Sequence, residues 1–247
     1  MASSPSTYLV TGAARGIGFG LVETLVQRPG VTVFAAIRDI AKKDGVEKLN
    51  AKAAQGSKVV AIQIRAGDDD DAKAIPKTLS ENGVDHLDVV IANAGISNYY
   101  GLATETPLAQ FREHFEVNTI GFVSLFQAVF PFLDKSENPK FVYVSSAVAS
   151  MTRPFPLLTA AYGASKAAGN FVISKIHQEN ANLIAFAINP GWVQTDMGNM
   201  GARSAGLEQA PETLEASVNG ILDRTDNATR EKDGGKFKDY KEEDIPW

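Results

Sequence analysis

Cysteine is missing from the 247 residues of this chain, and charge of neither sign is in large excess. The absence of cysteine excludes disulfides, thiolate metal sites and cysteine nucleophiles, and it permits a reducing compartment. The 24 Lys and Arg residues against 29 Asp and Glu residues give a formal net charge of −5. So mild a charge argues against a nucleic acid or an anionic membrane surface as a partner.

Membrane-spanning and targeting patterns are also missing. No apolar run approaches the length of a bilayer span, and the opening residues MASSPST lack the basic and apolar regions of a signal peptide. Asn227 to Thr229 match a glycosylation sequon, which we interpret as chance because no secretion signal accompanies it. We therefore expect a cytoplasmic protein without a membrane partner.

Strand-like and helix-like segments alternate along the chain. The strand-like segments, which are apolar throughout, lie at 7–12, 31–37, 58–64, 87–92, 140–145, 183–189 and 236–240, and the helix-like segments at 16–28, 40–55, 70–82, 107–134, 160–180 and 211–224. Uniformly apolar strands are typical of parallel strands covered on both faces. The pattern predicts an α/β fold, a Rossmann-type doubly wound, mostly parallel seven-stranded sheet with helices on both faces, in one domain over 1–247.

Three segments differ from this alternation. We expect residues 1–6 to be a flexible N-terminus. The acidic run GDDDDAKAI at 67–75 predicts a solvated helix start, where carboxylates interact well with the positive helix end, rather than a metal site. The Gly-rich stretch at 197–210 predicts a mobile loop or short helices over the carboxyl edge of the sheet, and we expect it to be the substrate loop.

The stretch TGAARGIG, at 11–18, connects the first strand to the first helix. Its glycines, Gly12, Gly16 and Gly18, would let the backbone approach a pyrophosphate, while the helix N-terminus offers free N–H groups and a positive dipole. A glycine turn between a strand and a helix can equally solve only a packing problem. The spacing and the position in the first strand–helix unit favour a dinucleotide site.

Arginines mark the predicted adenosine end of this site. The second strand ends in TVFAAIRD, so Arg38 stands at the strand tip, where an acidic residue would bind the ribose 2′-hydroxyl of NAD. Arg38 and Arg15 together would hold the dianionic 2′-phosphate of NADP through bidentate, charge-assisted bonds. The alternative is that both are surface arginines. We predict NADP(H) as the cofactor and no metal.

The segment YGASK carries a tyrosine and a lysine at helical spacing. Tyr162 and Lys166, at i and i+4, share one helix face, and a neighbouring cation lowers the pKa of a phenol. Alone such a pair could lie on the surface. Upstream, VYVSSAVAS is a strand ending in serines that could bond a substrate carbonyl, and Asn118 lies inside a predicted helix, where asparagine is unfavourable. Asn118 could line a water path or bend the helix.

Taken in order, these motifs resemble the short-chain dehydrogenase/reductase family over nearly the whole chain. The ordered set is TGxxxGxG at 11–18, Asn93-Ala94-Gly95, Asn118, a strand-end serine, Tyr162-xxx-Lys166, and the PGxxxT motif with Pro190, Gly191 and Thr195. Any one motif is weak, whereas all six in order are specific. The cofactor contacts that the resemblance implies are Gly12, Arg15, Gly16, Ile17, Gly18, Arg38, Asn93, Ala94, Gly95, Tyr162, Lys166, Pro190, Gly191, Val193 and Thr195.

The resemblance also implies a catalytic tetrad of Asn118, Ser146, Tyr162 and Lys166. Tyr162 would donate a proton to the carbonyl oxygen as hydride leaves the nicotinamide. Lys166 would hold the ribose hydroxyls and lower the pKa of Tyr162, a serine would polarise the carbonyl, and Asn118 would support a proton-relay water. We choose Ser146 over Ser145 because the family usually uses the second serine at this strand end.

Two departures from the family pattern stand out. The spacing from Ser146 to Tyr162 is a few residues longer than usual, which widens the substrate side. The family generally has an aspartate at the end of the third strand that bonds the adenine amino group, whereas Arg65 stands there in this chain. Arg65 could stack on adenine or point to solvent. Its positive charge near the adenosine favours NADP over NAD.

Within the family, the chain resembles fungal norsolorinic-acid-type ketoreductases and sniffer-like carbonyl reductases. The supporting stretches are LDVVIANAGIS, LTAAYGASKAAGNF, NPGWVQTDMGNMGA and a tail ending in IPW. The resemblance implies NADPH-dependent reduction of an aryl or polyketide-derived ketone to a secondary alcohol. Candidate pocket residues, each of which could instead be core packing, are Tyr99, Tyr100, Phe155, Trp192, Met197 and Met200.

Two other functions stay open from the sequence: an NAD-dependent alcohol dehydrogenase and a catalytically silent regulator that senses NADP(H). The arginines argue against the first, and the intact tyrosine, lysine and asparagine argue against the second. The segment 111–133 is apolar nearly all round, which exceeds what a surface helix needs. In this family the equivalent helix commonly pairs across a two-fold axis, so we expect a homodimer or homotetramer.

Overall fold

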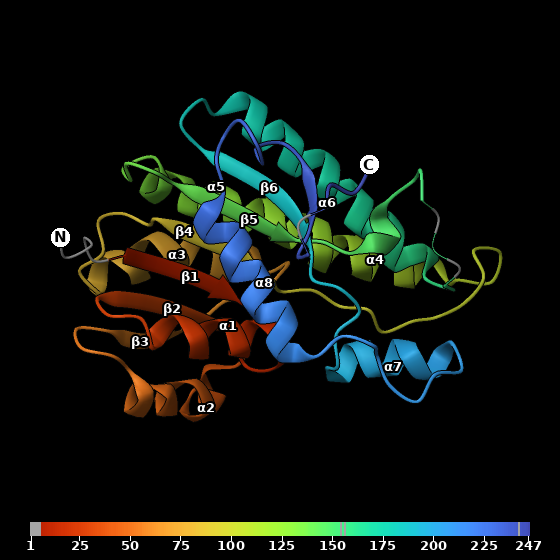
Figure 1. Ribbon diagram of the computed structural model, residues 1–247, viewed down its shortest axis with the longest axis horizontal. Coiled ribbons are helices and arrows are strands. Elements are labelled where there is room, and N and C mark those ends of the chain that lie inside the picture. The colour runs from red at the N-terminus through yellow and green to blue at the C-terminus, as the bar shows by residue number, and fades with distance from the viewer. Residues whose placement is uncertain (1–5, 154, 156, 242) are drawn as a thin grey trace.

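The computed structural model describes residues 6–153, 155, 157–241 and 243–247, and its strands form one sheet (Figure 1). The strand order is β3-β2-β1-β4-β5-β6-β7, and each strand runs parallel to its neighbours. The strands are β1 Ser6–Thr11, β2 Val31–Ile37, β3 Lys58–Gln63, β4 Val89–Ala92, β5 Lys140–Val144, β6 Ile184–Asn189 and β7 Phe237–Asp239. The order reverses between β1 and β4, and ligands bind beyond the carboxyl ends of the strands at such a point.

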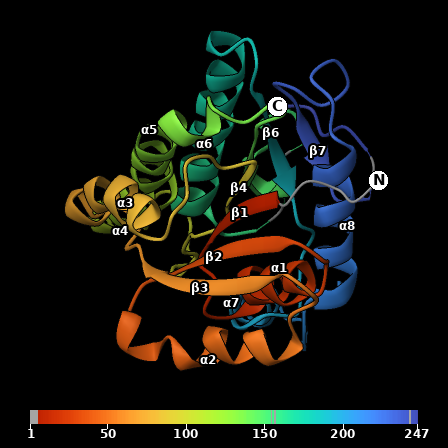
Figure 2. The same ribbon diagram turned by 90° about the vertical axis from the view of Figure 1, so that its left-hand side faces the viewer.

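Helices cover both faces of this sheet (Figures 1 and 2). They are α1 Gly16–Val26, η1 Ile40–Lys42, α2 Asp44–Glu47, η2 Lys48–Lys52, α3 Asp69–Glu81, α4 Leu108–Phe115, η3 Glu116–Ile120, α5 Gly121–Leu133, η4 Ala147–Ala149, α6 Ala160–Glu179, α7 Asp196–Ser204 and α8 Leu214–Asn227. One face of the sheet buries apolar side chains of α1, α2 and α8, and the other buries those of α3, α5 and α6. The predicted doubly wound fold is confirmed, and burial on both faces explains why the strands are apolar throughout.

One predicted helix is wrong. The segment 40–55 forms three short turns, η1, α2 and η2, instead of a continuous helix. Only Val46 and Leu49 are buried within these turns, and α2 contains Gly45, which is a poor helix former. So small an apolar stripe leaves little packing energy to hold a long helix together.

The predicted helix over 107–134 contains an irregular turn. Residues Glu116–Ile120 form a π-helical turn between α4 and α5, and Asn118 lies inside it, so the irregularity expected at Asn118 is present. Turns of this type often occur at functional sites. Gly121 follows, where a Cβ atom would lie 2.6 Å from the backbone nitrogen of Gly67, so the two segments approach closely.

The same helix corrects one sequence expectation. By length and composition, Leu108–Leu133 is apolar enough to cross a membrane, so the statement that no segment approaches this length is wrong. Nearly half of its most apolar window is nevertheless buried inside the domain, as in the core helix of a soluble protein. It also carries Arg112 and Glu113 on α4 and the fully buried Asn118.

The acidic run is only partly the solvated helix start that was predicted. Asp68 caps α3 by accepting from the backbone nitrogen of Asp71 at 3.0 Å, and Asp69 and Asp70 are exposed. Asp71, however, is buried, and its carboxylate holds the guanidinium of Arg65. A buried carboxylate needs such a partner, which lies outside the run and is invisible in its local pattern.

The N-terminus and the Gly-rich stretch 197–210 are two further segments for which the sequence made predictions. Residues 1–5 of the expected flexible N-terminus lie outside the described residues, whereas Ser6 begins β1 and its backbone nitrogen donates to the carbonyl of Gly30 at 3.1 Å. The Gly-rich stretch 197–210 contains most of α7, which is the short-helix alternative.

Candidate active site

The glycine turn between β1 and α1 lets neighbouring groups approach its backbone closely. Gly12 and Gly16 have φ values of +67° and +56°, which side chains rarely adopt. A Cβ atom on Gly12 would also lie 2.9 Å from the side-chain nitrogen of Asn93. The N-terminus of α1 has no side-chain cap and no acidic residue in its first turn. Its free N–H groups therefore suit an anion such as a pyrophosphate, so these residues fit the predicted dinucleotide.

Thr11 ties this turn to the end of β4, a role that the sequence prediction missed. Its hydroxyl accepts from the backbone nitrogens of Asn93 and Ala94, both at 3.0 Å, and its carbonyl accepts from the Asn93 side chain at 2.8 Å. The threonine that opens the TGxxxGxG motif was the available signal. The structure thus brings the predicted residues Asn93 and Ala94 against Gly12, at the reversal point of the strand order.

The two predicted phosphate-binding arginines have different surroundings. Arg15 Nη1 forms an ion pair with Asp196 Oδ2 at 2.9 Å, with both side chains about three-quarters exposed. Within the described part of the chain, Arg38 has no ion-pair partner, and it lies directly after β2. An exposed ion pair of this kind contributes about 0–1 kcal/mol to stability, so Asp196 leaves Arg15 available to bind another anion.

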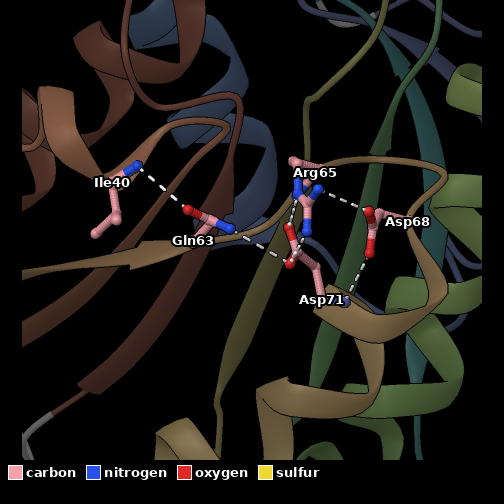
Figure 3. A network of polar contacts seen from close by, with 5 residues as sticks. All are labelled: Ile40, Gln63, Arg65, Asp68 and Asp71. Atoms are coloured by element: carbon pink, nitrogen blue, oxygen red, sulfur yellow. Dashed lines mark hydrogen bonds and ion pairs between the residues drawn. The ribbon is translucent and has the colours of Figure 1, made fainter.

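Arg65 is held by two acidic side chains at the end of β3. Its guanidinium chelates Asp71 and pairs with Asp68, as Figure 3 shows. Its charge is paired with two carboxylates, and the side chain is still 48% exposed. Stacking on adenine and a contribution of Arg65 to NADP preference therefore stay predictions.

Tyr162 and Ser146 meet at the carboxyl end of the sheet. Tyr162 lies in the first turn of α6, and Ser146 follows β5, whose end is adjacent to β4. Burial raises the pKa of Tyr162 to about 12, and its hydrogen bond with Ser146 opposes that shift. The predicted lowering of this pKa by Lys166 is not seen, because burial sets the direction of the shift and the opposing effect comes from Ser146.

The structure separates the two candidate serines. The hydroxyl of Ser145 is 2% exposed and donates to Oδ1 of Asn170 at 2.6 Å, on the buried side of the strand. Ser146 instead has its hydroxyl at Tyr162. The backbone of Ser146 is extended just beyond β5, and successive side chains of an extended backbone point to opposite sides, which explains why the two serines have different partners.

Lys166 is buried one helical turn beyond Tyr162. It is 3% exposed, and its Nζ donates to the carbonyl of Val144 at 2.7 Å. Burial lowers the pKa of Lys166 to about 7. Gly95 faces the same point, since a Cβ atom there would lie 3.3 Å from Lys166 Nζ and 3.0 Å from Oδ1 of Asn118. The predicted residues Gly95, Asn118 and Lys166 are thus brought together.

Asn118 fastens the segment after β4 to α6. Its side chain exchanges hydrogen bonds with the backbone of Ile96, at 2.8 and 3.0 Å, and donates to the hydroxyl of Ser165 at 3.0 Å. Its main-chain carbonyl accepts from the hydroxyl of Tyr143 at 3.1 Å. The sequence signal found Asn118 but missed Tyr143, which is an ordinary strand residue by pattern.

The PGxxxT motif also lies in this region. Gly191 has φ +82°, and a Cβ atom there would lie 2.7 Å from the ring of Tyr240. Thr195 caps α7 by accepting from Gly198 N at 3.1 Å, and its methyl group would lie 3.3 Å from a Cβ atom on Gly16. The PGxxxT segment therefore packs against the glycine turn.

A mostly apolar cavity of about 420 Å³ opens onto Ser146 and Tyr162. Its other lining residues are Ile17, Ser97, Tyr100, Ser145, Ala147, Val148, Phe155, Leu157, Thr159, Asn189, Pro190, Gly191, Trp192, Val193, Thr195, Met197, Gly198, Gly201, Pro211, Glu212, Asp239, Tyr240, Lys241 and Glu243. The rings of Phe155 and Trp192 meet edge to face at 6.4 Å. Four of the six candidate pocket residues, Tyr100, Phe155, Trp192 and Met197, therefore line the cavity.

Two predicted pocket residues lie elsewhere. Of the described residues, Tyr99 and Met200 do not line this cavity. The Tyr99 ring folds over Gly101, where a Cβ atom would lie 2.8 Å from it. Met200 is 45% exposed, because α7 turns Met197 and Gly201 inward instead. Residue type alone does not reveal which face of a short helix is covered.

Comparisons with known proteins agree with this geometry. The family model described as short chain dehydrogenase matches residues 6–204. The norsolorinic acid ketoreductase of Aspergillus parasiticus is 42% identical over 98% of this chain and 91% of its own length. A second norsolorinic acid ketoreductase, from Dothistroma septosporum, is 39% identical over 99% of this chain and 94% of its own.

Solved structures give the same result. A carbonyl reductase from chicken fatty liver, crystallised with NADPH, has a TM-score of 0.87 and 27% identity, with 99% of each chain covered. The carbonyl reductase Sniffer of D. melanogaster shares the fold, with a TM-score of 0.84 at 21% identity and coverage of 99% of this chain and 100% of its own. This chain belongs to the short-chain dehydrogenase family, and it is an oxidoreductase that transfers hydride between a nicotinamide cofactor and a C=O or CH–OH group.

Proposed function

We propose that the protein is an NADPH-dependent ketoreductase that reduces an aryl or polyketide-derived ketone to a secondary alcohol. The observation that carries this proposal is that the side chains of Ser146 and Tyr162 line the same mostly apolar cavity, close enough for Ser146 to lower the pKa of the phenol. A ketone oxygen placed between these hydroxyls would receive two hydrogen bonds. The reduced nicotinamide, when bound, supplies the hydride.

Tyr162 is the proton donor in this proposal. Because burial raises its pKa to about 12, the phenol keeps its proton at neutral pH, which is the form that reduction requires. Ser146 polarises the carbonyl and holds it within reach of the phenol. Lys166 positions the ribose of the cofactor, and Asn118 positions α6. We also propose a water relay through Asn118.

The arginines at the adenosine end support NADPH over NADH. Arg38 stands at the tip of β2, and Arg15 is held only by an exposed pair with Asp196. A dianionic phosphate that both guanidinium groups contact would outcompete one exposed carboxylate. The NADPH bound to the chicken liver carbonyl reductase points the same way.

The cavity supports an aromatic ketone as substrate. Its volume of about 420 Å³ lies within the usual range for ligand pockets, roughly 300–1,000 Å³. Tyr100, Phe155 and Trp192 provide flat apolar walls beside the reacting hydroxyls. Two relatives named for norsolorinic acid reduction share about two-fifths of the sequence.

We further propose a single-domain cytoplasmic protein that forms a homodimer or homotetramer. Leu108 on α4, Ile120 on η3 and Phe171 on α6 are 68%, 46% and 69% exposed. Apolar side chains this exposed on neighbouring helices favour contact with a second copy. The same proposal assigns 197–210 as the substrate loop, because Met197, Gly198 and Gly201 line the cavity.

NADPH oxidation by purified protein with a panel of aryl ketones tests the proposed function. Wild-type protein should turn over, and Tyr162→Phe should lose turnover while its Kd for NADPH stays within a few-fold. Preference for NADH with an alcohol substrate would favour the dehydrogenase alternative. Tight NADPH binding without turnover of any ketone would favour a silent sensor.

A further inference from the structure

The wall segment, residues 192–194, follows β6 and precedes α7 without belonging to either. Trp192 and Val193 line the cavity together with Ser146 and Tyr162. Because the wall segment stands outside the sheet of the described chain, the shape of this side of the cavity depends on contacts that other parts of the chain supply.

Glu212 holds the wall segment through its backbone. Its backbone nitrogen donates to the carbonyl of Trp192 at 3.0 Å, and its carbonyl accepts from the backbone nitrogen of Gln194 at 2.8 Å. These two bonds form a parallel bridge between Val193 and Glu212. The intervening residues contain α7 and the proposed substrate loop, so the bridge closes the neck of that loop.

The segment after β7 clamps the side chain of Glu212. Oε2 of Glu212 accepts from the hydroxyl of Tyr240 at 2.5 Å, and Oε1 accepts from Nζ of Lys241 at 2.6 Å. These bonds, the one from Lys241 most strongly, hold the pKa of Glu212 below its usual value, so this group is a carboxylate at neutral pH. Lys241 Nζ also lies 5.2 Å from the centroid of the Tyr240 ring. The three side chains therefore form one cluster, the neck clamp.

Tyr240 gives the neck clamp a rigid base. It is 6% exposed, and its backbone nitrogen donates to the carbonyl of Asn189 at 3.1 Å. Its ring is wedged between Gly191 and Gly220, where Cβ atoms would lie 2.7 and 2.5 Å from ring atoms. Distances this short leave no space on either side, so close packing fixes the ring and its hydroxyl.

We propose that Glu212 is a positioning residue, and that the neck clamp fixes the wall segment against which the ketone is held. All three clamp residues line the cavity, so the clamp acts at the site itself. The inference rests on the proposed function, because it assumes a ketone in the cavity. The side chains of Glu212 and Lys241 are 26% and 57% exposed, and an ion pair so exposed contributes little to global stability. A small displacement of a positioning group nevertheless slows a reaction by a large factor.

Charge reversal followed by charge exchange tests the clamp. Glu212→Lys places a second ammonium beside Lys241 and should lower kcat/KM for an aryl ketone by about 10- to 100-fold. The Kd for NADPH should stay within a few-fold, since the glycine turn and the arginines lie elsewhere. Adding Lys241→Glu restores a pair of opposite charges, and the Tyr240 hydroxyl can accept from an ammonium. This double variant should recover most of the lost kcat/KM, which general damage to the fold would not allow.

Trp192 supplies a second measurement that needs no turnover. The chain has two tryptophans, and Trp247→Phe leaves Trp192 as the single one while keeping an aromatic ring on Phe237. Trp192 Nε1 donates to the carbonyl of Gly198 at 2.9 Å, so its fluorescence reports on the order of the wall segment. In this background, acrylamide quenching of Trp192 should rise in Glu212→Lys and return toward the parent value in the double variant.

Two further variants accompany these measurements. Glu208→Lys makes the same charge reversal at an exposed position of the substrate loop, and it should match the parent protein in both measurements. Tyr240→Phe keeps the wedged ring and removes only the hydroxyl, so it should change both measurements in the same direction as Glu212→Lys but by less. Circular dichroism establishes that each variant is folded. If Glu212→Lys is not, Tyr240→Phe decides, and parent values for it overturn the inference.

The outcomes separate the inference from the proposed function. Unless both measurements change in Glu212→Lys and recover in the double variant, the positioning role of Glu212 is overturned, and the ketoreductase proposal stands. Change and recovery in both measurements support the inference. If the wild type turns over no ketone, the proposed function fails, and the quenching series alone decides whether Glu212 holds the wall segment.

Discussion

Lys166 Nζ lies 4.7 Å from the centroid of the Tyr143 ring. A cation over an aromatic face is stabilised by the charge distribution of the ring. Tyr143 therefore offsets part of the burial that lowers the pKa of Lys166 to about 7. Because the Tyr143 hydroxyl also donates to the carbonyl of Asn118, one residue of β5 positions two members of the expected tetrad.

Tyr143 can be separated into ring and hydroxyl by two variants. Tyr143→Phe keeps the ring beneath Lys166 and loses the bond to Asn118, at about 1–3 kcal/mol of stability for the unpaired carbonyl. Tyr143→Leu loses the ring as well, and with it about 1–2 kcal/mol of cation–π stabilisation. This loss should lower the pKa of Lys166 further and reduce kcat by about tenfold. The pH dependence of NADPH binding is the measurement. Identical profiles for the two variants would contradict a role for the ring.

The buried ammonium of Lys166 makes stability depend on pH. Its pKa falls from 10.5 to about 7 on folding, so between these values the unfolded state binds more protons. The free energy of unfolding should therefore rise with pH across that window and fall toward its lower end. Urea denaturation of wild type and Lys166→Met at about pH 7 and pH 10 should show a smaller rise in the variant. Lys175→Met, a half-exposed lysine of α6, should keep the wild-type rise.

The two serines at the end of β5 should differ in kinetics and stability. Ser146→Ala removes the group that meets Tyr162 and should lower kcat by about 10²–10³, with little change in the Kd for NADPH. Ser145→Ala breaks the buried bond to Asn170 and should instead lower stability by about 1–3 kcal/mol. Steady-state kinetics and denaturation on both variants are the measurements. Full activity of Ser146→Ala would move the role to Ser145.

The arginine pair should decide between the two nicotinamide cofactors. Arg15→Ala with Arg38→Ala should raise KM for NADPH far more than KM for NADH, because only NADPH carries the 2′-phosphate. Asp196→Asn should have the opposite effect, since it removes the carboxylate that competes for Arg15. Equal changes for both cofactors in the arginine variant would rule out the proposed phosphate site.

The exposed apolar side chains of α4, η3 and α6 predict self-association. Light scattering of wild type should give the mass of a dimer or a tetramer. The variants Phe171→Glu and Leu108→Glu replace side chains that are 69% and 68% exposed with charged ones. Both variants should be monomers that remain folded. Met151→Glu is the control, because Met151 is 78% exposed but lies outside these helices. A monomeric wild type would reject the oligomer.

Local patterns in the sequence determined the fold class and most of the site. Apolar strands, glycine spacing and the tyrosine–lysine interval are short-range properties, and each is dictated by backbone geometry within one strand, turn or helix. They selected Gly12, Tyr162 and Lys166, which the structure places at the carboxyl edge of the sheet. The family resemblance added Asn118 and Ser146, which the tertiary structure brings to the same point.

The tertiary structure alone decided which distant groups meet. Arg65 takes its charge partner from the following acidic run, Tyr143 lies beneath Lys166, and burial sets both pKa directions in the tyrosine–lysine pair. The placement of Tyr99 and Met200 away from the cavity was decided in the same way. Charge partners, burial and the covered face of a short helix depend on long-range packing. The apolar periodicity of a single helix or strand carries no information about that packing.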